Sequence, residues 1–270
     1  MIYCVWYPSG GFGHFINAVL NLHGKNFVRP TNEIKFSHTG NLHALELPAP
    51  KYCHDPKNYN FSFDQNFNYS VLIDNGINNE GEKFKTIFPT AHIIKLCYND
   101  VSWPIVAKTM IDKAMQSSLD EQLIVDCDKW DVNEPWVIRE KYFLFLRDHN
   151  LRQAWKPTIG VTNLLVNDMM DYSQLRNQLL SSGVDLDNFE SLHLAWHEAN
   201  KQYIDPVKKM QSIIESIKNN VNVSLNLISS HWEQAVLYYF LWITFGQEIS
   251  HNDYANFFLD TNSVRKWLKL

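Results

Sequence analysis

The stretch IYCVWYPSGGFGHFINAVL, residues 2–20, decides the fold predicted for this chain. It begins with an apolar and aromatic run, typical of a buried β-strand, which stops at Pro8. A glycine-rich turn follows, and Phe15, Val19 and Leu22 then recur at helical spacing. The order of strand, glycine-rich loop and helix predicts main-chain amides and a helix N-terminus gathered at one point. That arrangement suits an anion such as a phosphate or sulfate group.

Further strands and helices are predicted along the rest of the chain. The strands are apolar runs at residues 71–74, 91–98 and 162–166. Helical patterns cover residues 103–115, 135–148, 171–182, 188–219 and 231–245, followed by a short terminal helix. We expect Asp171 to cap its helix and the long helix to break near Pro206. The alternation of strands and helices predicts an α/β fold of three layers, αβα, with a mainly parallel sheet.

The whole chain, residues 1–270, is predicted to form a single α/β domain. Residues 29–68 are polar and have few periodic apolar positions. A long irregular segment in a compact domain is usually functional, so we expect a substrate loop or lid there.

Composition and charge exclude several classes of protein. Hydrophobic residues make up 45% of the chain, enough for a sizeable core, and the net charge of −5 argues against a nucleic-acid partner. The longest apolar run, residues 235–245, is far shorter than the roughly twenty residues that span a bilayer, so no membrane partner is expected. The cysteines lack metal-ligand spacing, and we expect reduced thiols in a cytoplasmic protein: Cys4, Cys53, Cys97 and Cys127. Nothing in the sequence indicates an oligomeric state.

The glycine-rich loop is not a Walker A motif. In the pattern GxxxxGK followed by Ser or Thr, Gly13 fits, but Pro8, His14 and Phe15 replace the required Gly, Lys and hydroxyl residue. The hydroxyl that would hold Mg²⁺ is therefore missing. Hydrolysis of ATP or GTP is not expected.

The loop does resemble the 5′-phosphosulfate loop of the sulfotransferases, which has the pattern Tyr-Pro-x-Ser-Gly. Residues 7–10 match this pattern except that Ser9 follows Pro8 directly. Sulfotransferases are enzymes of the P-loop NTPase-like fold that use 3′-phosphoadenosine 5′-phosphosulfate. Residues 89–100, PTAHIIKLCYND, are similar to the family's second block, a strand and loop that bind the 3′-phosphate of this donor. Residues 164–184 resemble the late strand, loop and helix of many members.

The resemblance implies transfer of a sulfuryl group from this donor to a hydroxyl of a carbohydrate or small molecule, with no metal ion. It also implies that the donor is bound by the two loops, through Ser9, Gly10, Gly11, Phe12, Gly13, His14, Asn99 and Ser102. A base must take the proton of the acceptor hydroxyl. His14, beside the glycines, and Asp74, at a strand end, are the catalytic candidates, ahead of His38, His43 and His54.

Two charged residues of the family are missing. The loop contains no lysine, and Tyr98 stands where the second block has an arginine. Loss of one charged donor to the transition state commonly costs about 3 to 4 kcal/mol. Two alternatives therefore stay open. One is a GDP-sugar-dependent fucosyltransferase, whose Ser-Gly-Gly-x-Gly-Asn start resembles residues 9–14 but whose His-x-Arg-Arg element is absent. The other is a non-catalytic nucleotide- or anion-binding protein of P-loop fold.

Two other groups of polar residues are candidates for binding. His193 and His197 stand four residues apart on a predicted helix beside Glu198, but no third ligand is evident and no metal is expected. Three arginines, Arg139, Arg147 and Arg152, lie in or after one predicted helix. Arg139, beside Glu140, is interpreted as an exposed helix charge or as a contact to a nucleotide phosphate.

Overall fold

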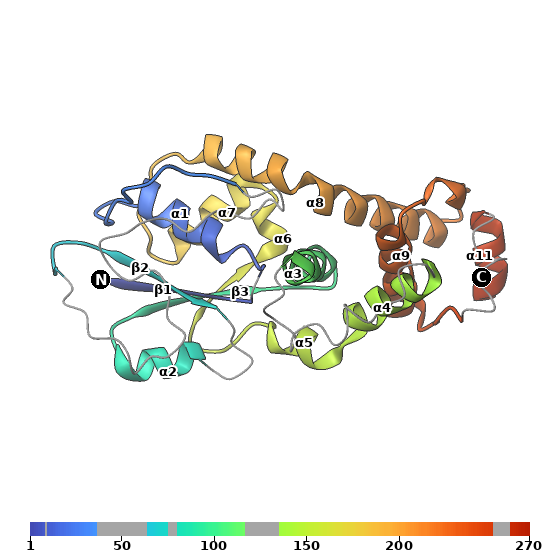
Figure 1. The fold of residues 1–270 in the computed structure, drawn as a ribbon, viewed down its shortest axis with the longest axis horizontal. Coiled ribbons are helices and arrows are strands. Elements are labelled where there is room, and N and C mark those ends of the chain that lie inside the picture. The colour runs from blue at the N-terminus through green and yellow to red at the C-terminus, as the bar shows by residue number, and fades with distance from the viewer. Residues whose placement is uncertain (9, 37–63, 75–79, 117–134, 251–259) are drawn as a thin grey trace. The chain divides into compact units, whose positions relative to one another are not determined.

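The computed structural model describes residues 1–8, 10–36, 64–74, 80–116, 135–250 and 260–270 (Figure 1). Within these ranges, residues 74, 80, 82, 113–116 and 135 are described by their backbone alone. Most of the predicted lid, residues 37–63, lies outside them. The chain forms two compact units, the first made of Met1–Ser102 and Asn150–Lys201, the second of Trp103–His149 and Gln202–Leu270. The single domain predicted over residues 1–270 stays a prediction.

The first unit contains a parallel sheet. Its strands lie in the order β2-β1-β3-β4, where β1 is Ile2–Tyr7, β2 is Tyr69–Asp74, β3 is His92–Cys97 and β4 is Thr162–Leu165. β1 pairs in parallel with β2 and with β3, and β3 pairs in parallel with β4. The predicted parallel arrangement is therefore confirmed for the described strands. The fold of this unit is α/β.

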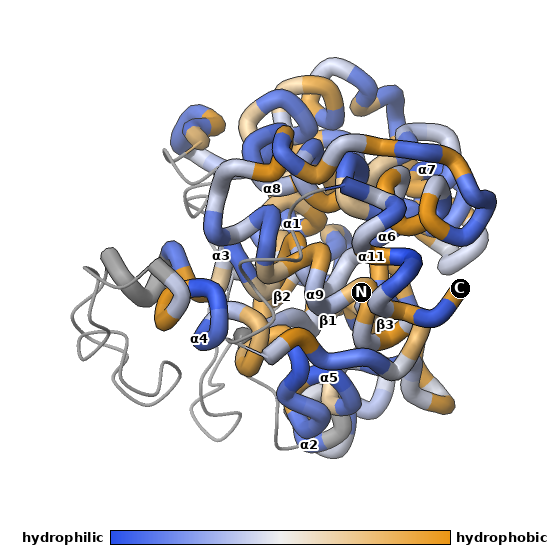
Figure 2. Tube along the Cα trace, turned by 90° about the vertical axis from the view of Figure 1, so that its right-hand side faces the viewer, coloured by the Kyte–Doolittle hydropathy of each residue, from blue (hydrophilic) through white to orange (hydrophobic). Residues whose placement is uncertain are grey.

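Helices cover both faces of this sheet, as apolar runs in parallel strands require. Helices α1 (Gly13–His23) and α7 (Tyr172–Ser181) lie on one face, and α2 (Glu80–Ile87) and α5 (His149–Ala154) on the other (Figure 1). Side chains of β1 alternate between the faces: the Tyr7 ring lies against Gly13 of α1, whereas Trp6 lies against Gly81 of α2. Helix α5 buries no residue and is mostly hydrophilic in Figure 2.

The α7 cap is confirmed. The Asp171 side chain accepts a hydrogen bond of 2.8 Å from the main-chain nitrogen of Gln174. Just before it, the predicted strand ends one residue early, because Val166 begins the short helix α6 (Val166–Met169).

The second unit is helical in its described part. It contains α3 (Trp103–Gln116), α4 (Pro135–Arg147), η3 (Leu225–Leu227), α9 (His231–Phe245), α11 (Thr261–Leu268) and the later part of α8 (Glu190–Lys218). Aromatic pairs join α4 to α9: the ring centroids of Tyr142 and Trp232 are 5.6 Å apart. A capping box between Ser230 and Glu233 begins α9.

The break predicted near Pro206 is wrong, because α8 is continuous from Glu190 to Lys218. A proline inside a helix lacks one N–H and costs about 3 kcal/mol. Ile204, Val207 and Met210, on both sides of the proline, are buried. Burial of this apolar face offsets the local cost and keeps the helix in one piece.

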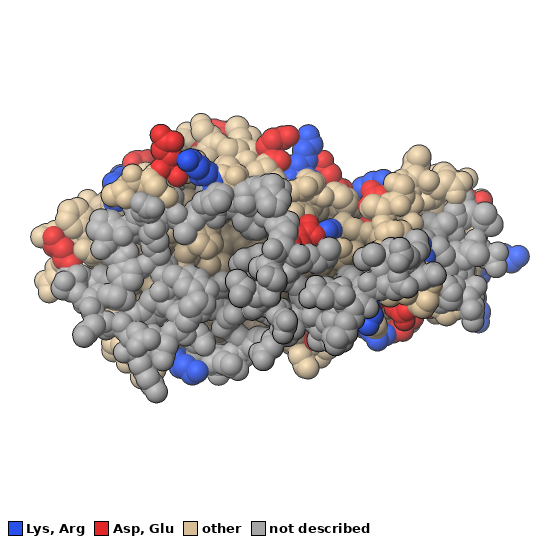
Figure 3. Space-filling model, in the orientation of Figure 1, with Lys and Arg blue, Asp and Glu red and all other residues tan. Residues whose placement is uncertain are grey.

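Charges of both signs are interspersed on the face shown in Figure 3, as far as its described residues go. Lys25 and Asp185 form an ion pair of 2.8 Å. None of the helices in the described part of the chain combines the length and apolar character needed to cross a membrane.

Candidate site at the carboxyl edge of the sheet

The carboxyl ends of β1 and β3 are neighbours at one edge of the sheet. The two strands are paired as far as Trp6 and Lys95. The chain leaves β1 for β2 on one side, whereas it leaves β3 for β4 on the other. Such a topological switch point is where open α/β sheets bind their ligands. The loops after the two strands, residues 8–12 and 98–102, therefore form the candidate site.

Tyr98 joins these two loops. Its hydroxyl donates a buried hydrogen bond of 2.9 Å to the carbonyl oxygen of Gly11. Within the first loop, the Gly11 nitrogen donates to the Pro8 oxygen at 2.7 Å. The position at which the sulfotransferase resemblance expects an arginine is thus occupied by a phenol that connects the loops.

Gly11 of the first loop and Gly13, the first residue of α1, are explained by packing against protein side chains. A Cβ atom on Gly11 would lie 2.3 Å from the Tyr98 hydroxyl and 2.6 Å from Pro8, and one on Gly13 would lie 2.2 Å from the Tyr7 ring. The loop residues Pro8 and 10–13 are buried. The glycines are therefore no longer a reason in themselves to expect a bound anion, and the described part of the turn is covered by side chains.

The remaining residues of this loop lead into α1. Gly10 and Phe12 have left-handed backbones, with φ of 76° and 66°. The Phe12 ring stands edge-on to Trp196 at 5.2 Å, which leaves Phe12 in the core. Ser9 lies outside the described residues.

The two catalytic candidates lie near Tyr7. The His14 ring is partly exposed and stands at 81° to the Tyr7 ring, with 5.9 Å between centroids. Asp74 is aligned with Tyr7 at the end of β2. The structure describes only the backbone of Asp74, so the role of its carboxylate stays a prediction.

Asn99 and Ser102 order the second loop through mutual hydrogen bonds. The Asn99 Oδ1 atom accepts from the main-chain nitrogens of Val101 and Ser102, at 3.0 and 2.9 Å, and from the Ser102 hydroxyl at 3.0 Å. The Asn99 nitrogen donates to the same hydroxyl at 3.0 Å. Ser102 is fully buried. These two side chains therefore shape the loop that leads into α3.

Arg152, at the end of α5, reaches this second loop. Its Nε atom lies 3.8 Å from Oδ1 of Asp100, and its side chain is 16% exposed against 57% for the aspartate. In the sequence, Arg152 was grouped only with Arg139 and Arg147 and was not predicted to lie at the site. No local signal would have predicted this position, because the contact depends on how the segment after α5 returns to β3.

Lys95 fixes that return. It is buried in β3, and its Nζ atom donates to the carbonyl oxygens of Ala154 and Lys156, at 3.1 and 2.9 Å, and to the Thr158 hydroxyl at 2.8 Å. The same nitrogen lies 4.6 Å from the centre of the Trp6 ring, a cation–π distance. Lys95 thereby holds the segment that directly follows Arg152.

The other candidate ligands are not assembled into a metal site. His193 is buried, and its Nε2 atom lies 2.7 Å from the Met169 carbonyl oxygen, while His197 lies 6.5 Å away between ring centroids. No group of three or more potential metal ligands occurs in the described ranges.

The buried cysteines of the strands are reduced thiols. Cys4 and Cys97 lie in β1 and β3, as expected, and neither forms a disulfide. Burial raises the pKa of the Cys97 thiol to about 11, although Lys95 acts in the opposite direction. Cys97 is therefore uncharged at neutral pH and unsuited to nucleophilic chemistry. Cys53 and Cys127 lie outside the described residues.

Comparison of the chain with protein-family models, with curated proteins and with solved structures found no match.

Proposed function

We propose that the first unit binds a phosphorylated adenine nucleotide at the switch point between β1 and β3, as a sulfotransferase-like protein of the P-loop fold class. The position of Arg152 carries this proposal. Its Nε atom lies 3.8 Å from the Oδ1 atom of Asp100. Asp100 belongs to the loop after β3, which neighbours the loop after β1. An arginine at such an edge is suited to a phosphate, because its planar group donates parallel hydrogen bonds to two oxygens.

The nucleotide is inferred from the sequence resemblance. Residues 7–10 and 89–100 resemble the blocks that bind 3′-phosphoadenosine 5′-phosphosulfate. Arg152 approaches the second of these blocks, the one that the resemblance assigns to the 3′-phosphate. A phosphate there would compete with the exposed carboxylate of Asp100 for the guanidinium. Asn99 and Ser102 would support it by holding the loop in shape.

Sulfuryl transfer is the reaction that the resemblance implies. The oxygen of an acceptor hydroxyl, on a carbohydrate or small molecule, would bond to sulfur as the bond from sulfur to the 5′-phosphate oxygen breaks. Adenosine 3′,5′-bisphosphate would leave, and a base would take the hydroxyl proton. His14 is the described residue best placed for that role, since it is partly exposed at the start of α1.

A nucleotide-binding protein without transferase activity is the second candidate. No lysine or arginine precedes Lys25, and Tyr98 replaces the family's arginine. Charge on the departing phosphate would therefore lack its usual partners at the first loop. We accordingly expect binding of the bisphosphate and slow or absent transfer.

Calorimetric titration tests the proposal with three nucleotides: adenosine 3′,5′-bisphosphate, adenosine 5′-monophosphate and GDP. We expect the bisphosphate to bind most tightly, and Arg152→Gln to weaken it at least tenfold. Arg176→Gln, on α7, is the matched control and should leave the affinity unchanged.

Three results would decide against this assignment. Preference for GDP would favour the glycosyltransferase alternative. If none of the three nucleotides binds at millimolar concentration, the proposed nucleotide site is refuted. Equal affinities of the Arg152→Gln and Arg176→Gln variants for the bisphosphate would show that Arg152 does not contribute to the nucleotide site.

A further inference from the structure

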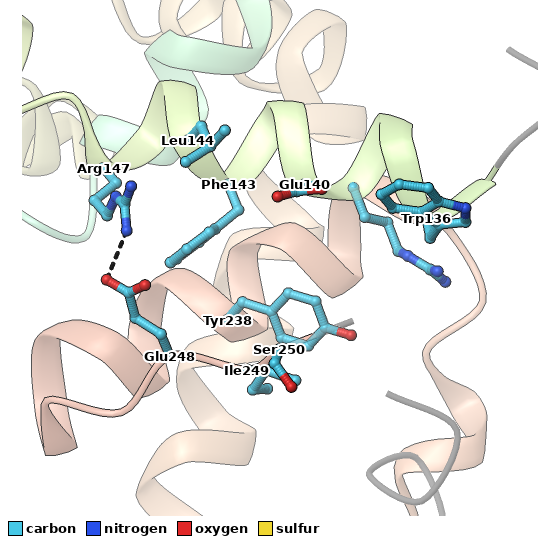
Figure 4. A pocket seen from close by; sticks show the side chains of 10 residues that line it. Trp136, Glu140, Phe143, Leu144, Arg147, Tyr238, Glu248, Ile249 and Ser250 are labelled. Atoms are coloured by element: carbon cyan, nitrogen blue, oxygen red, sulfur yellow. Dashed lines mark hydrogen bonds and ion pairs between the residues drawn. The ribbon is translucent and has the colours of Figure 1, made fainter. Parts of the chain in front are cut away.

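The second unit contains a cavity of about 380 Å³ between α4, α9 and residues 248–250 (Figure 4). Pockets for small ligands usually measure about 300 to 1,000 Å³. All of the described lining residues belong to the second unit. The cavity is therefore not formed by the loops of the candidate nucleotide site.

Aromatic rings form much of the cavity wall. Trp136 and Phe143 come from α4, and Tyr238 comes from α9 (Figure 4). The rings of Phe143 and Tyr238 are 6.5 Å apart between centroids and stand at 83°, an edge-to-face contact. Flat apolar surfaces of this kind favour a ligand that contains a planar ring.

A nearly buried arginine lies in the same wall. The exposed helix charge predicted for Arg139 is wrong, because this residue is only 7% exposed. Its Nη1 atom donates a hydrogen bond of 2.8 Å to Oε1 of Gln234. Burial lowers the pKa of the Arg139 guanidinium, and the neighbouring Tyr238 acts in the opposite direction. A guanidinium has five N–H donors in a fixed plane, which match the two oxygens of a carboxylate.

The other polar groups of the wall fit the same class of ligand. Burial raises the pKa of Tyr238, so its phenol is uncharged at neutral pH and can donate a hydrogen bond. At one end, Arg147 and Glu248 form an ion pair of 2.6 Å, so their charges balance each other (Figure 4). Glu140 also lines the cavity but is exposed to solvent.

We propose that this cavity binds a small aromatic carboxylate, with the ring against Trp136, Phe143 and Tyr238 and the carboxylate on Arg139. A purely apolar ligand would fill the aromatic part of the wall but form no charge-assisted hydrogen bond with Arg139. An aliphatic acid would satisfy the charge but gain less from the flat ring surfaces. The two features together select a ligand that has both a ring and a negative charge.

Calorimetric titration of the full chain tests this inference with phenylacetate and 2-naphthoate, each compared with its neutral amide. We expect each acid to bind at least tenfold more tightly than its amide, because only the acid forms charge-assisted hydrogen bonds with Arg139. Arg139→Gln should remove this preference for the acid while weak binding of the ring remains.

A variant whose cavity is filled by a larger side chain provides a second test of the inference. Leu144 lines the cavity and is 38% exposed, so Leu144→Trp adds bulk to the wall without disturbing a buried position. It should abolish binding of both acids. Leu194→Trp, at a position that is 62% exposed and lies in the first unit, is the matched control and should bind like the unmodified protein.

The inference is overturned if neither acid binds at 5 mM, if acid and amide bind equally, or if Leu144→Trp binds as well as Leu194→Trp. Should Arg139→Gln fail to fold, the acid-to-amide ratio of the unmodified protein and the Leu144→Trp result decide the question. Nucleotide titrations of the same variants keep this test separate from the proposed function, since none of these residues belongs to the nucleotide site.

Discussion

Tyr98 and Gly11 are joined by a buried hydrogen bond of 2.9 Å, although 87 residues separate them in the sequence. The bond connects the loop after β1 with the loop after β3, at the switch point of the sheet. Tyr98 thus has a structural role at the position where the second block of the sulfotransferases has an arginine. The geometry of the candidate site depends on this pair.

Removal of the Tyr98 hydroxyl should destabilise the first unit. Tyr98→Phe retains the ring but leaves the buried Gly11 carbonyl without this donor, at a cost of about 1 to 2 kcal/mol. Urea denaturation followed by circular dichroism measures the change. Tyr172→Phe removes a hydroxyl bonded to Asn188 at an exposed site and should cost less than about 0.5 kcal/mol. Similar losses in the two variants would contradict the role given to Tyr98.

Added methyl groups at Gly11 and Gly13 should lower the free energy of unfolding. Gly13→Ala places a Cβ atom 2.2 Å from the Tyr7 ring, and overpacking of this kind costs about 1 to 3 kcal/mol. Gly11→Ala should cost less in the Tyr98→Phe background, because the hydroxyl that it meets at 2.3 Å is gone. A denaturation double-mutant cycle measures this coupling. Strict additivity of the two changes would show that Gly11 and Tyr98 do not constrain each other.

Lys95 should contribute strongly to stability. Lys95→Met keeps an unbranched side chain, one atom shorter, but leaves the acceptors on Ala154, Lys156 and Thr158 without their donor. We expect a loss of about 3 kcal/mol in the free energy of unfolding, measured by chemical denaturation. Lys156→Met, at an exposed position, is the control and should change stability by less than about 0.5 kcal/mol. Equal effects would mean that the buried ammonium is dispensable.

Cys97 should make the fold sensitive to alkaline pH. Its thiol has a pKa of about 11 in the folded protein, raised from 9.0 by burial. The resulting stabilisation is complete below pH 9, where the thiol of the unfolded chain is also protonated, and is lost as pH rises toward 11. The slope attributable to Cys97 is at most about 1.4 kcal/mol per pH unit.

Denaturation at pH 8, 9 and 10 measures this slope. Cys97→Ala should be less stable than the unmodified protein at pH 8, because a small cavity is created, but should lose less stability between pH 9 and 10. Tyr203 and Tyr238, whose pKa values burial also raises, affect both proteins alike. Parallel pH profiles for the two proteins would rule out this contribution of Cys97.

The strands of the sheet could be predicted because their signal is local. Apolar runs at β1 and β3 are long enough to indicate buried strands, and Asp171 stands where a helix cap is expected. The parallel order follows from the alternation of strands and helices. The break near Pro206 was predicted wrongly because residue propensity is also local, whereas the burial that offsets it depends on partners elsewhere in the chain.

The site was harder to predict, since its decisive contacts join distant segments. The Gly11 environment depends on Tyr98, and the position of Arg152 depends on Lys95, 57 residues earlier in the chain. Short glycine-rich sequences look alike whether the space beside them holds a ligand or a tyrosine ring. The cavity of the second unit was missed for the same reason, because its wall combines α4 with α9 and residues 248–250.

Lys95 also affects how mutational data on this protein would be interpreted. It touches no proposed ligand, yet it anchors the segment that directly follows Arg152 to the sheet. A random-mutagenesis screen for lost nucleotide affinity should therefore recover changes at Lys95 together with changes at Arg152. Changes at Lys95 would lower the affinity by destabilising the fold. Measurement of thermal unfolding alongside affinity would separate them from changes at Arg152, which act on the binding surface.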